Sequence, residues 1–283
     1  MKKPYIISAD STSDIPKEIV SRFGIEILPL YVNLGEKSFR DGIEVTNDDI
    51  EKYVKETGAL PTTSAPDPAT FIEYFKNASE RAKFVIYFSI GSELSCSFQN
   101  ARLAAADFEN VYVVDTQSLC IGETLSVYKA CELAEDGKSA QEIIDYIEIY
   151  KTKINGSFVI DNLEYLRRGG RCSAAAALGA NVLQLKPTIE LRDGKLGVGK
   201  KYRGKFLKVV SSYVEEKLET AKPIDKRIFL AFTRCDSEVI NAAKEAIEAS
   251  GLFDEIILAD AGSTIFSHCG PSTLGIMFAD ENF

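Results

Sequence analysis

Short apolar runs separated by polar clusters and helical patterns dominate the first half of the chain. Residues 5–8, 84–88 and 111–115 are short apolar runs, and the last two are nearly continuous. Such runs are typical of strands that are buried on both faces of a parallel sheet. Branched residues predict a further strand over residues 25–32. Because helical patterns alternate with these strands, the pattern predicts an α/β half with a largely parallel sheet.

Turn and cap residues mark the ends of several predicted helices. One helix is predicted over residues 50–57, preceded by the capping residues Asn47-Asp48-Asp49 and stopped at Gly58. Residues 60–68 contain three prolines, which fix much of the backbone and predict a stiff loop. A helix is expected to follow through residues 71–75.

The pattern changes after about residue 152. Asp193-Gly194 lies between two strand-like segments and indicates a hairpin. We therefore expect two packed α/β lobes, residues 1–155 and 156–283. In the second lobe the pattern predicts helices over residues 163–169, 174–185, 206–219 and 236–249, and strands over residues 158–160, 228–232 and 255–259.

Composition and charge narrow the function classes. The net charge of −9 argues against broad nucleic-acid binding, which needs a basic surface. No apolar run approaches the length that spans a bilayer, and the first residues lack the long apolar segment of a signal peptide. We therefore expect a soluble, cytoplasmic protein with no membrane span.

The counts of cysteine and histidine limit the chemistry further. Six cysteines include no Cys-x-x-Cys pair, and His268 is the one histidine in the chain. A zinc site is therefore not expected, no metal or cofactor is predicted, and the cysteines are expected to be reduced. Any Ser-His or Cys-His mechanism would have to use His268.

Three segments at predicted element ends carry hydroxyl groups or the histidine. The Ser95 segment follows a predicted strand and opens a helix, where free N–H groups and the positive dipole end favour an anion. Ligands of α/β sheets bind where such loops converge. The three segments are Thr62-Thr63-Ser64, Ser95-Cys96-Ser97 and His268-Cys269-Gly270-Pro271.

Each of these residues also has a simpler interpretation. Ser95 can merely cap its helix, and Thr63 and Ser64 can be plain turn residues. His268 can be a buried histidine with satisfied hydrogen bonds, although its Gly-Pro context places it in a turn, which favours a functional role. The residues alone leave these alternatives open.

Two basic segments stand out in this acidic chain. Arg167-Arg168-Gly169-Gly170-Arg171 ends a predicted helix, where glycine permits a positive φ. Its arginines can complement the helix dipole or pair with acidic residues. Lys200, Lys201, Arg203 and Lys205, followed by Lys208, form the densest basic run. Such a run is usually a solvated face, and the alternative is a docking patch for an acidic partner or for phosphate groups.

Five segments, in order along nearly the whole chain, together resemble the DegV family. The family includes the fatty-acid-binding subunits of bacterial fatty acid kinase. Each segment alone is a weak signal, and all five in order are specific. The segments are Asp10-Ser11-Thr12-Ser13-Asp14, Thr63-Ser64-Ala65-Pro66, Leu94-Ser95-Cys96-Ser97-Phe98-Gln99-Asn100-Ala101, Leu163-Glu164-Tyr165-Leu166-Arg167-Arg168-Gly169-Gly170-Arg171 and His268-Cys269-Gly270-Pro271.

The resemblance implies a lipid carrier without catalytic residues of its own. Its ligand would be a long-chain fatty acid, buried between the two lobes. The resemblance implies that Thr63 holds the carboxylate together with Ser95 and the neighbouring N–H group at Cys96, and that His268 assists. A kinase subunit would phosphorylate this carboxylate to an acyl phosphate, in a role in phospholipid metabolism.

The basic run is the candidate docking surface for that kinase, with Arg203 as its centre. Lys200, Lys201 and Lys205 are the neighbouring candidates. Cys96 stands where the family usually has glycine, and Ser272 replaces a glycine after the histidine motif. These departures affect the expected identity of the fatty acid. They affect the expected class of ligand less.

Two other functions remain possible from the residues. An acyl hydrolase could use Ser95 or Cys96 as the nucleophile and His268 as the base. No Gly-x-Ser-x-Gly motif supports it, because Gly91-Ser92-Glu93-Leu94-Ser95 lacks the second glycine. A binder of phosphate or sugar phosphate ranks last, since the chain has no Gly-rich phosphate loop.

Overall fold

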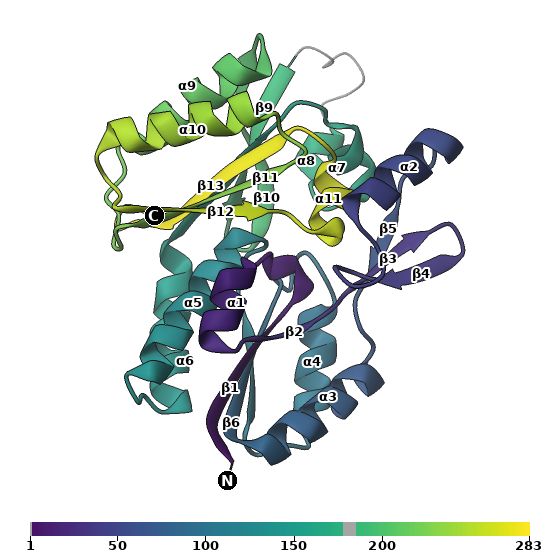
Figure 1. Ribbon diagram of the computed structural model, residues 1–283, viewed down its shortest axis with the longest axis vertical. Coiled ribbons are helices and arrows are strands. Elements are labelled where there is room, and N and C mark those ends of the chain that lie inside the picture. Colours follow the sequence, from purple (N-terminus) through teal and green to yellow (C-terminus); the bar gives the residue numbers. More distant parts are fainter. Residues whose placement is uncertain (1, 178–184) are drawn as a thin grey trace. The chain divides into compact units, whose positions relative to one another are not determined.

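The computed structural model describes residues 2–177 and 185–283 (Figure 1). The chain divides into two units. Unit 1 consists of Met1–Thr152 and Gly262–Thr264, and unit 2 consists of Lys153–Ala261 and Ile265–Phe283. The chain therefore returns to unit 1 for three residues before it ends in unit 2.

Unit 1 alternates strands and helices. Its elements are β1 (Lys3–Asp10), the 3₁₀ turn η1 (Ser11–Ser13), α1 (Lys17–Phe23), β2 (Glu26–Leu28), β3 (Tyr31–Leu34), β4 (Lys37–Arg40), α2 (Asn47–Thr57), β5 (Thr62–Ser64), α3 (Pro68–Arg81), β6 (Ala82–Ser89), α4 (Ser97–Ala105), β7 (Val111–Asp115), α5 (Ile121–Glu135) and α6 (Ala140–Tyr150).

A four-stranded sheet in the order β2-β1-β6-β7 forms the centre of unit 1, and all its strands are parallel. This confirms the predicted parallel α/β half. Helices α3 and α4 cover one side of the sheet, and α5 and α6 lie on the other (Figure 1). The core under α3 and α4 is aromatic, with Phe71 and Phe75 packed edge-on against the ring of Tyr87 on β6.

A second, antiparallel sheet in the order β4-β3-β5 corrects two predictions. The strand predicted over residues 25–32 is two strands, β2 and β3, in different sheets. Pro29 lies between them, and it removes a backbone donor from the ladder and so ends the first pairing. The loop predicted over residues 60–68 contains β5, in which Thr63 pairs with Val32.

Unit 2 follows a short turn, η2 (Lys151–Lys153), at the unit boundary. Its elements are β8 (Ile154–Ile160), α7 (Glu164–Gly169), α8 (Ser173–Ala176), β9 (Leu185–Arg192), β10 (Lys195–Arg203), α9 (Phe206–Leu218), β11 (Arg227–Thr233), α10 (Ser237–Ser250), β12 (Glu255–Asp260), α11 (Ser263–Cys269), which begins with two residues of unit 1, and β13 (Thr273–Ala279).

The sheet of unit 2 has the order β10-β9-β8-β13-β11-β12. Only β11 and β12 are parallel neighbours in it, and the other neighbouring pairs are antiparallel. The hairpin predicted at Asp193-Gly194 is confirmed, because β9 and β10 pair on either side of it. Both turn residues have positive φ, 50° and 75°, as a tight hairpin turn of this kind requires.

Helices α9 and α10 lie side by side on one face of this sheet (Figure 1). They bury branched and aromatic residues against β8, β11 and β13. Tyr213 of α9 is fully buried, and its hydroxyl donates to the carbonyl oxygen of Ser157 at 2.6 Å. That bond satisfies a polar group that would otherwise be costly to bury.

Two further predictions for unit 2 need correction. The helix predicted over residues 174–185 is α8, a single turn, and Leu185 already begins a strand. The rest of that prediction, residues 178–184, lies outside the described residues. His268 does not lie in a turn, because it belongs to the last turn of α11. In the part of the chain that the structure describes, no helix has the length and apolar character needed to cross a membrane.

Candidate functional site

The Ser95 segment connects β6 to α4. Leu94 and Ser95 both donate their N–H groups to the carbonyl oxygen of Gly91, at 2.9 and 3.2 Å, which closes a tight turn. The Ser95 Oγ accepts the N–H of Ser97 at 3.1 Å. Ser95 therefore helps to start the helix, although Cys96 is its N-cap residue and makes no side-chain cap bond. Because this bond uses the oxygen of Ser95, its hydroxyl proton can be donated to another acceptor.

One side chain links the Ser95 segment to the segment that carries Thr63. The Asn100 Nδ2, one turn into α4, donates to the carbonyl oxygen of Pro66 at 2.8 Å. Pro66 follows β5, which contains Thr63. Thr63 and Ser95 are both half-buried, whereas Cys96 is exposed. Unit 1 thus brings the two hydroxyl-bearing motifs next to each other.

The histidine motif and the glycine-arginine motif meet in unit 2. A Cβ placed on Gly169, at the end of α7, would lie 2.6 Å from the Nδ1 of His268. A Cβ on Gly270 would lie 2.5 Å from the Cδ2 of Tyr165, and Gly270 has a φ of +70°. The ring of Tyr165 also packs edge-on against Phe266. Both motifs need their glycines because α7 and the end of α11 approach so closely.

His268 is electrically neutral at neutral pH. Burial, together with the positive charge of Arg171, lowers the pKa of its imidazole to about 4. A neutral imidazole has one N–H donor and one acceptor nitrogen. The ring can therefore donate a hydrogen bond to an anion, but it does not bring a positive charge to it.

The end of α7 confirms the predicted positive φ at one of its two glycines. Gly170 is in the left-handed conformation with a φ of +73°. The Nη1 of Arg171 donates to the carbonyl oxygen of Gly169 at 2.8 Å, which complements the free carbonyls of the helix end. Arg168 lies 3.5 Å from Glu164 on the exposed side.

The basic run lies on β10 and on the turn that follows, at one edge of the unit 2 sheet. Lys200 is paired with Glu216 of α9 at 2.6 Å, and Tyr202 donates to the same carboxylate at 2.7 Å. Lys201, Arg203 and Lys205 are exposed. Lysine on an edge strand also discourages pairing with another sheet, which is the simpler role for this run.

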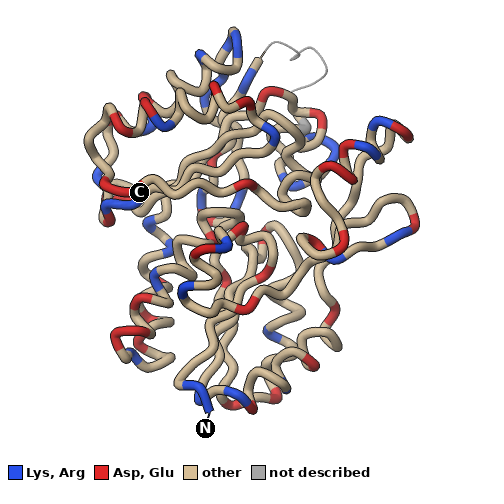
Figure 2. The backbone as a smooth tube through the Cα atoms, viewed as in Figure 1, with Lys and Arg blue, Asp and Glu red and all other residues tan. Residues whose placement is uncertain are grey.

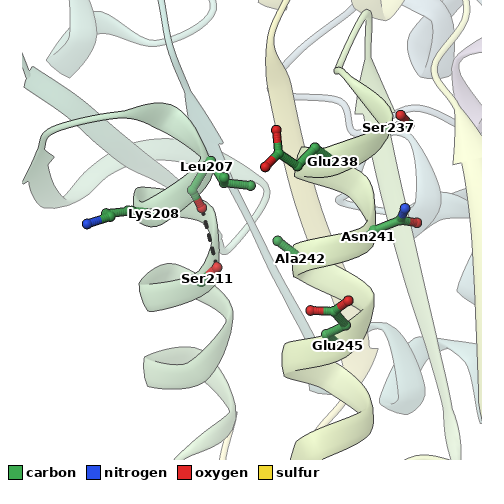
Figure 3. Close-up of a pocket in the computed structure, with 8 residues that line it drawn as sticks. All are labelled: Leu207, Lys208, Ser211, Ser237, Glu238, Asn241, Ala242 and Glu245. Carbon is green, nitrogen blue, oxygen red and sulfur yellow. Dashed lines mark hydrogen bonds between the residues drawn. The ribbon is translucent and has the colours of Figure 1, made fainter.

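A groove between α9 and α10 is the wrong kind of surface for an acyl chain. Figure 3 shows Leu207 pointing toward α10, and Glu238 and Glu245 pointing toward α9. Polar and charged side chains form most of its lining, and acidic and basic residues are interspersed over both helices (Figure 2). Pockets for apolar ligands are lined mainly by hydrophobic side chains.

A buried carboxyl network at the end of β1 was missed by the sequence analysis. Asp10 is fully buried and accepts the N–H groups of Thr12 and Ile90 at 3.0 and 2.8 Å. Burial raises its pKa to about 6. The Thr12 Oγ1 lies 2.5 Å from Asp10 and 3.3 Å from Glu123, which is also fully buried.

The hydroxyl group of Thr12 lies between the two carboxyl groups of this network. Thr12 can donate to only one of the two carboxyl groups, and Asp10 is the nearer. A protonated Glu123 can donate to the Thr12 oxygen, and this arrangement gives both carboxyl groups a hydrogen bond with Thr12. Burial and the neighbouring Asp10 both raise the pKa of Glu123 well above 4.5, in agreement. The first motif of the chain is therefore an internal structural network of unit 1. In the described ranges, no group of three or more His, Cys, Asp or Glu residues could hold a metal ion.

Comparison with known proteins places the chain in a family. The family model described as "Uncharacterised protein, DegV family" matches residues 5–281. The chain belongs to the DegV family. The resemblance of its five motifs is thereby confirmed. A DegV domain-containing protein of Caldanaerobacter subterraneus subsp. tengcongensis is 30% identical over 283 residues, covering 99% of this chain and 100% of the relative.

Solved structures of DegV proteins share the fold of this chain. A structure from Thermus thermophilus, described as showing fatty acid binding of a DegV family protein, is 34% identical with a TM-score of 0.88. It covers 98% of this chain and 99% of its own. DegV of Bacillus subtilis, described as a fatty acid binding protein, is 27% identical with a TM-score of 0.81, over 99% of this chain and 100% of its own.

Proposed function

We propose that this DegV protein binds a long-chain fatty acid. The observation that carries the proposal is the match over nearly the full length of both chains to the Thermus thermophilus structure, which is described by its fatty acid binding. DegV of Bacillus subtilis supports the same ligand class. The net charge and the absence of a Gly-rich phosphate loop from the sequence favour this class over a phosphate ligand.

Thr63, Ser95 with the N–H at Cys96, and His268 are the proposed donors to the carboxylate. A carboxylate that leaves water must receive several hydrogen bonds, or it takes up a proton instead. Ser95 has a hydroxyl proton to donate, and the start of α4 adds N–H groups and a positive dipole end. The neutral ring of His268 adds a donor without placing a counter-charge beside the carboxylate.

The acyl chain supplies most of the binding free energy in this proposal. Each methylene that is removed from water contributes about 0.8 kcal/mol. A tail of a dozen or more methylenes then contributes about 10 kcal/mol or more, which is enough to offset much or all of the roughly 4–15 kcal/mol that association costs. The carboxylate contacts orient the ligand and add the remaining share of its affinity.

Cys96 joins the site through its backbone in this proposal. Its side chain is exposed, and its Sγ lies 4.0 Å from the Nδ2 of Asn100. The thiol therefore lies on the exposed side of the first turn of α4.

The bound carboxylate is then phosphorylated by a partner kinase, which makes this chain a carrier and not an enzyme. Arg203, Lys201 and Lys205 are the proposed docking residues because they are exposed, whereas Lys200 is already paired with Glu216. The product would be an acyl phosphate, and the catalytic residues would belong to the kinase.

Mass spectrometry of the purified protein tests the ligand. We expect a mass excess under native conditions, and recovery of a fatty acid in the organic extract of the denatured protein. Thr63→Ala and Ser95→Ala should retain several-fold less fatty acid while staying folded. Ser79→Ala, which removes an exposed hydroxyl of unit 1, is the matched control and should retain the wild-type amount.

Two results would refute parts of this proposal. A mass without bound ligand that persists after incubation with fatty acids would refute the proposed function. Normal retention of fatty acid in both Thr63→Ala and Ser95→Ala would refute the proposed head-group site. The proposed class of ligand would still stand. Turnover of acyl esters that is abolished by His268→Ala would instead establish the hydrolase alternative.

Charge reversal tests the docking surface separately. The double variant Lys201→Glu/Arg203→Glu should bind fatty acid normally, and a fatty acid kinase should phosphorylate its ligand at least about tenfold more slowly at low ionic strength. Lys76→Glu, an exposed charge reversal on α3, is the control and should be phosphorylated at the wild-type rate. Equal phosphorylation rates for the two variants would refute β10 as the docking surface.

A further inference from the structure

The start of α11 is held by two carboxylates that come from distant parts of the chain. The Oδ1 of Asp14 accepts the N–H of Gly262 at 2.7 Å. The Oδ1 of Asp41 accepts the N–H of Ser263, the first residue of α11, at 3.0 Å. These contacts span 248 and 222 residues of sequence. Gly262–Thr264 accordingly belongs to unit 1.

Asp41 is itself fixed in place. Its exposed fraction is 3%, and its Oδ2 accepts the hydroxyl of Ser11 at 2.8 Å. Its backbone N–H donates to the carbonyl oxygen of Leu30 at 2.9 Å, and the N–H of Leu30 donates to the Oγ of Ser11 at 3.0 Å. Both carboxylate oxygens of Asp41 therefore have defined donors, and the side chain has little freedom to turn.

Gly262 is enclosed by the two carboxylates. A Cβ on this residue would lie 3.0 Å from the Oδ1 of Asp14 and 3.6 Å from the Oδ1 of Asp41. Ser263 adds a third link, because its hydroxyl donates to the carbonyl oxygen of Val45 at 3.3 Å. A helix start carries free N–H groups and the positive dipole end, which favour the oxygen atoms of aspartate as acceptors. Burial raises the pKa of both Asp14 and Asp41, and these backbone N–H donors oppose that rise.

His268 lies five residues after Ser263 in the same helix, a rise of about 7.5 Å. Such a short helical segment is stiff, so a displacement of its first residue is passed on to its last. At that last turn there is little free space, because a Cβ on Gly169 would already lie 2.6 Å from the His268 Nδ1.

We propose that Asp14 and Asp41 are positioning residues for the His268 imidazole. They bind two backbone N–H groups at the start of α11 and thereby fix the place of the ring near its other end. The role of the ring as a donor to a carboxylate rests on the proposed function. The anchoring of α11 by Asp14 and Asp41 is independent of that function.

The single histidine of the chain makes the test direct, because a proton NMR titration of the ligand-free protein shows one imidazole. In the wild type we expect its pKa near 4. Asp41→Ala should raise that pKa toward 6.5 by about half a unit or more, since a loosened ring is better hydrated. Asp41→Asn keeps an oxygen that can accept the Ser263 N–H, and it should restore a value close to the wild type.

Asp280→Ala is the matched control for loss of a buried aspartate. Asp280 is also 3% exposed and accepts two backbone N–H groups, from Lys222 and Asn282. It should leave the histidine titration unchanged. If Asp41→Ala does not fold, Ser11→Ala removes the hydroxyl that orients Asp41 and should give a smaller shift in the same direction.

The proposal is overturned if folded Asp41→Ala or Ser11→Ala titrates like the wild type, or if Asp280→Ala shifts the imidazole equally. Because the titration uses protein stripped of lipid, it does not depend on fatty acid binding. Failure of the wild type to take up any fatty acid would refute the proposed function and leave the positioning result standing.

Discussion

At the scale of single residues, the buried pair Asp10 and Glu123 makes stability depend on pH. Burial and the neighbouring Asp10 raise the pKa of Glu123 in the folded protein well above the 4.5 of an unfolded chain. Its contribution to stability is therefore complete below about pH 4.5 and is lost as the pH rises through the folded pKa. Glu123→Gln keeps a neutral donor for Thr12 at every pH.

We expect Glu123→Gln to be more stable than the wild type at pH 8.5, by on the order of 1 kcal/mol, and less pH-dependent. Urea unfolding at pH 5.5 and 8.5 measures this. Glu142→Gln is the opposite control, because hydrogen bonds from Ser139 lower the pKa of the exposed Glu142 to about 2. It should lose stability at neutral pH and not below pH 2. Equal pH profiles for wild type and Glu123→Gln would mean that Glu123 is ionised in the fold.

Gly270 gives a second prediction at this scale. Gly270→Ala forces a side chain into a φ of +70° and against the ring of Tyr165. We expect a loss of about 3 kcal/mol in unfolding free energy, from backbone strain and overpacking together. Gly251→Ala has a similar φ of +63° but nothing within 4 Å, so it should lose only about 1 kcal/mol. Equal losses would show that the contact with Tyr165 relaxes at no cost.

At the scale of elements, the link between α4 and the segment after β5 can be tested through Asn100. Asn100→Ala leaves the carbonyl oxygen of Pro66 without its donor, and the Thr63 segment loses its attachment. We expect about 1 kcal/mol less stability and about fivefold less fatty acid retained in the mass spectrometric assay. Asn110→Ala is the control, because Asn110 also donates to backbone carbonyls, those of Ser79, Ala82 and Lys83. It should lose more stability but retain the ligand, and the reverse order would contradict the link.

Elements could be predicted from the sequence where a few neighbouring residues specify their structure. The Asp193-Gly194 hairpin was predicted correctly because the turn residues alone specify the positive φ values. The buried strands of unit 1 were predicted correctly from their apolar runs. The break at Pro29 was missed because the branched residues on both sides of it suggest one strand. Helix α11 was missed because seven residues that include serine and threonine carry little helical pattern.

Some residues of the candidate site could likewise be predicted from the sequence, and others could not. The motifs around Thr63, Ser95 and His268 could be found in the sequence, and their roles in binding remain a prediction. Asp41 could not be found, because its partner Ser263 is 222 residues away and nothing local distinguishes it from a surface aspartate. Asn100 lies inside a motif that was recognised, but its contact with Pro66 depends on the tertiary fold.

At the scale of the whole molecule, ligand binding should appear as thermal stability. A ligand present at 100 times its Kd adds about 2.7 kcal/mol to the folded state. For a chain of this size that raises Tm by roughly 5–10 °C. We expect this rise in differential scanning calorimetry of lipid-stripped protein after fatty acid is added. The double variant Thr63→Ala/Ser95→Ala should show a much smaller rise in Tm. An equal rise in wild type and double variant would show that the proposed head-group site does not contribute to the stabilisation.

The return of Gly262–Thr264 to unit 1 sets an order for folding during synthesis. When the ribosome has made residue 152, Asp14 and Asp41 still lack the N–H groups that they accept in the finished protein. Translation of the next 110 residues takes roughly 5–20 s, and during that time the two aspartates lack these backbone donors. The first unit to emerge is thus completed almost last, when residue 264 of 283 has joined it. A nascent chain halted before that point would display an unfinished N-terminal unit to chaperones and proteases.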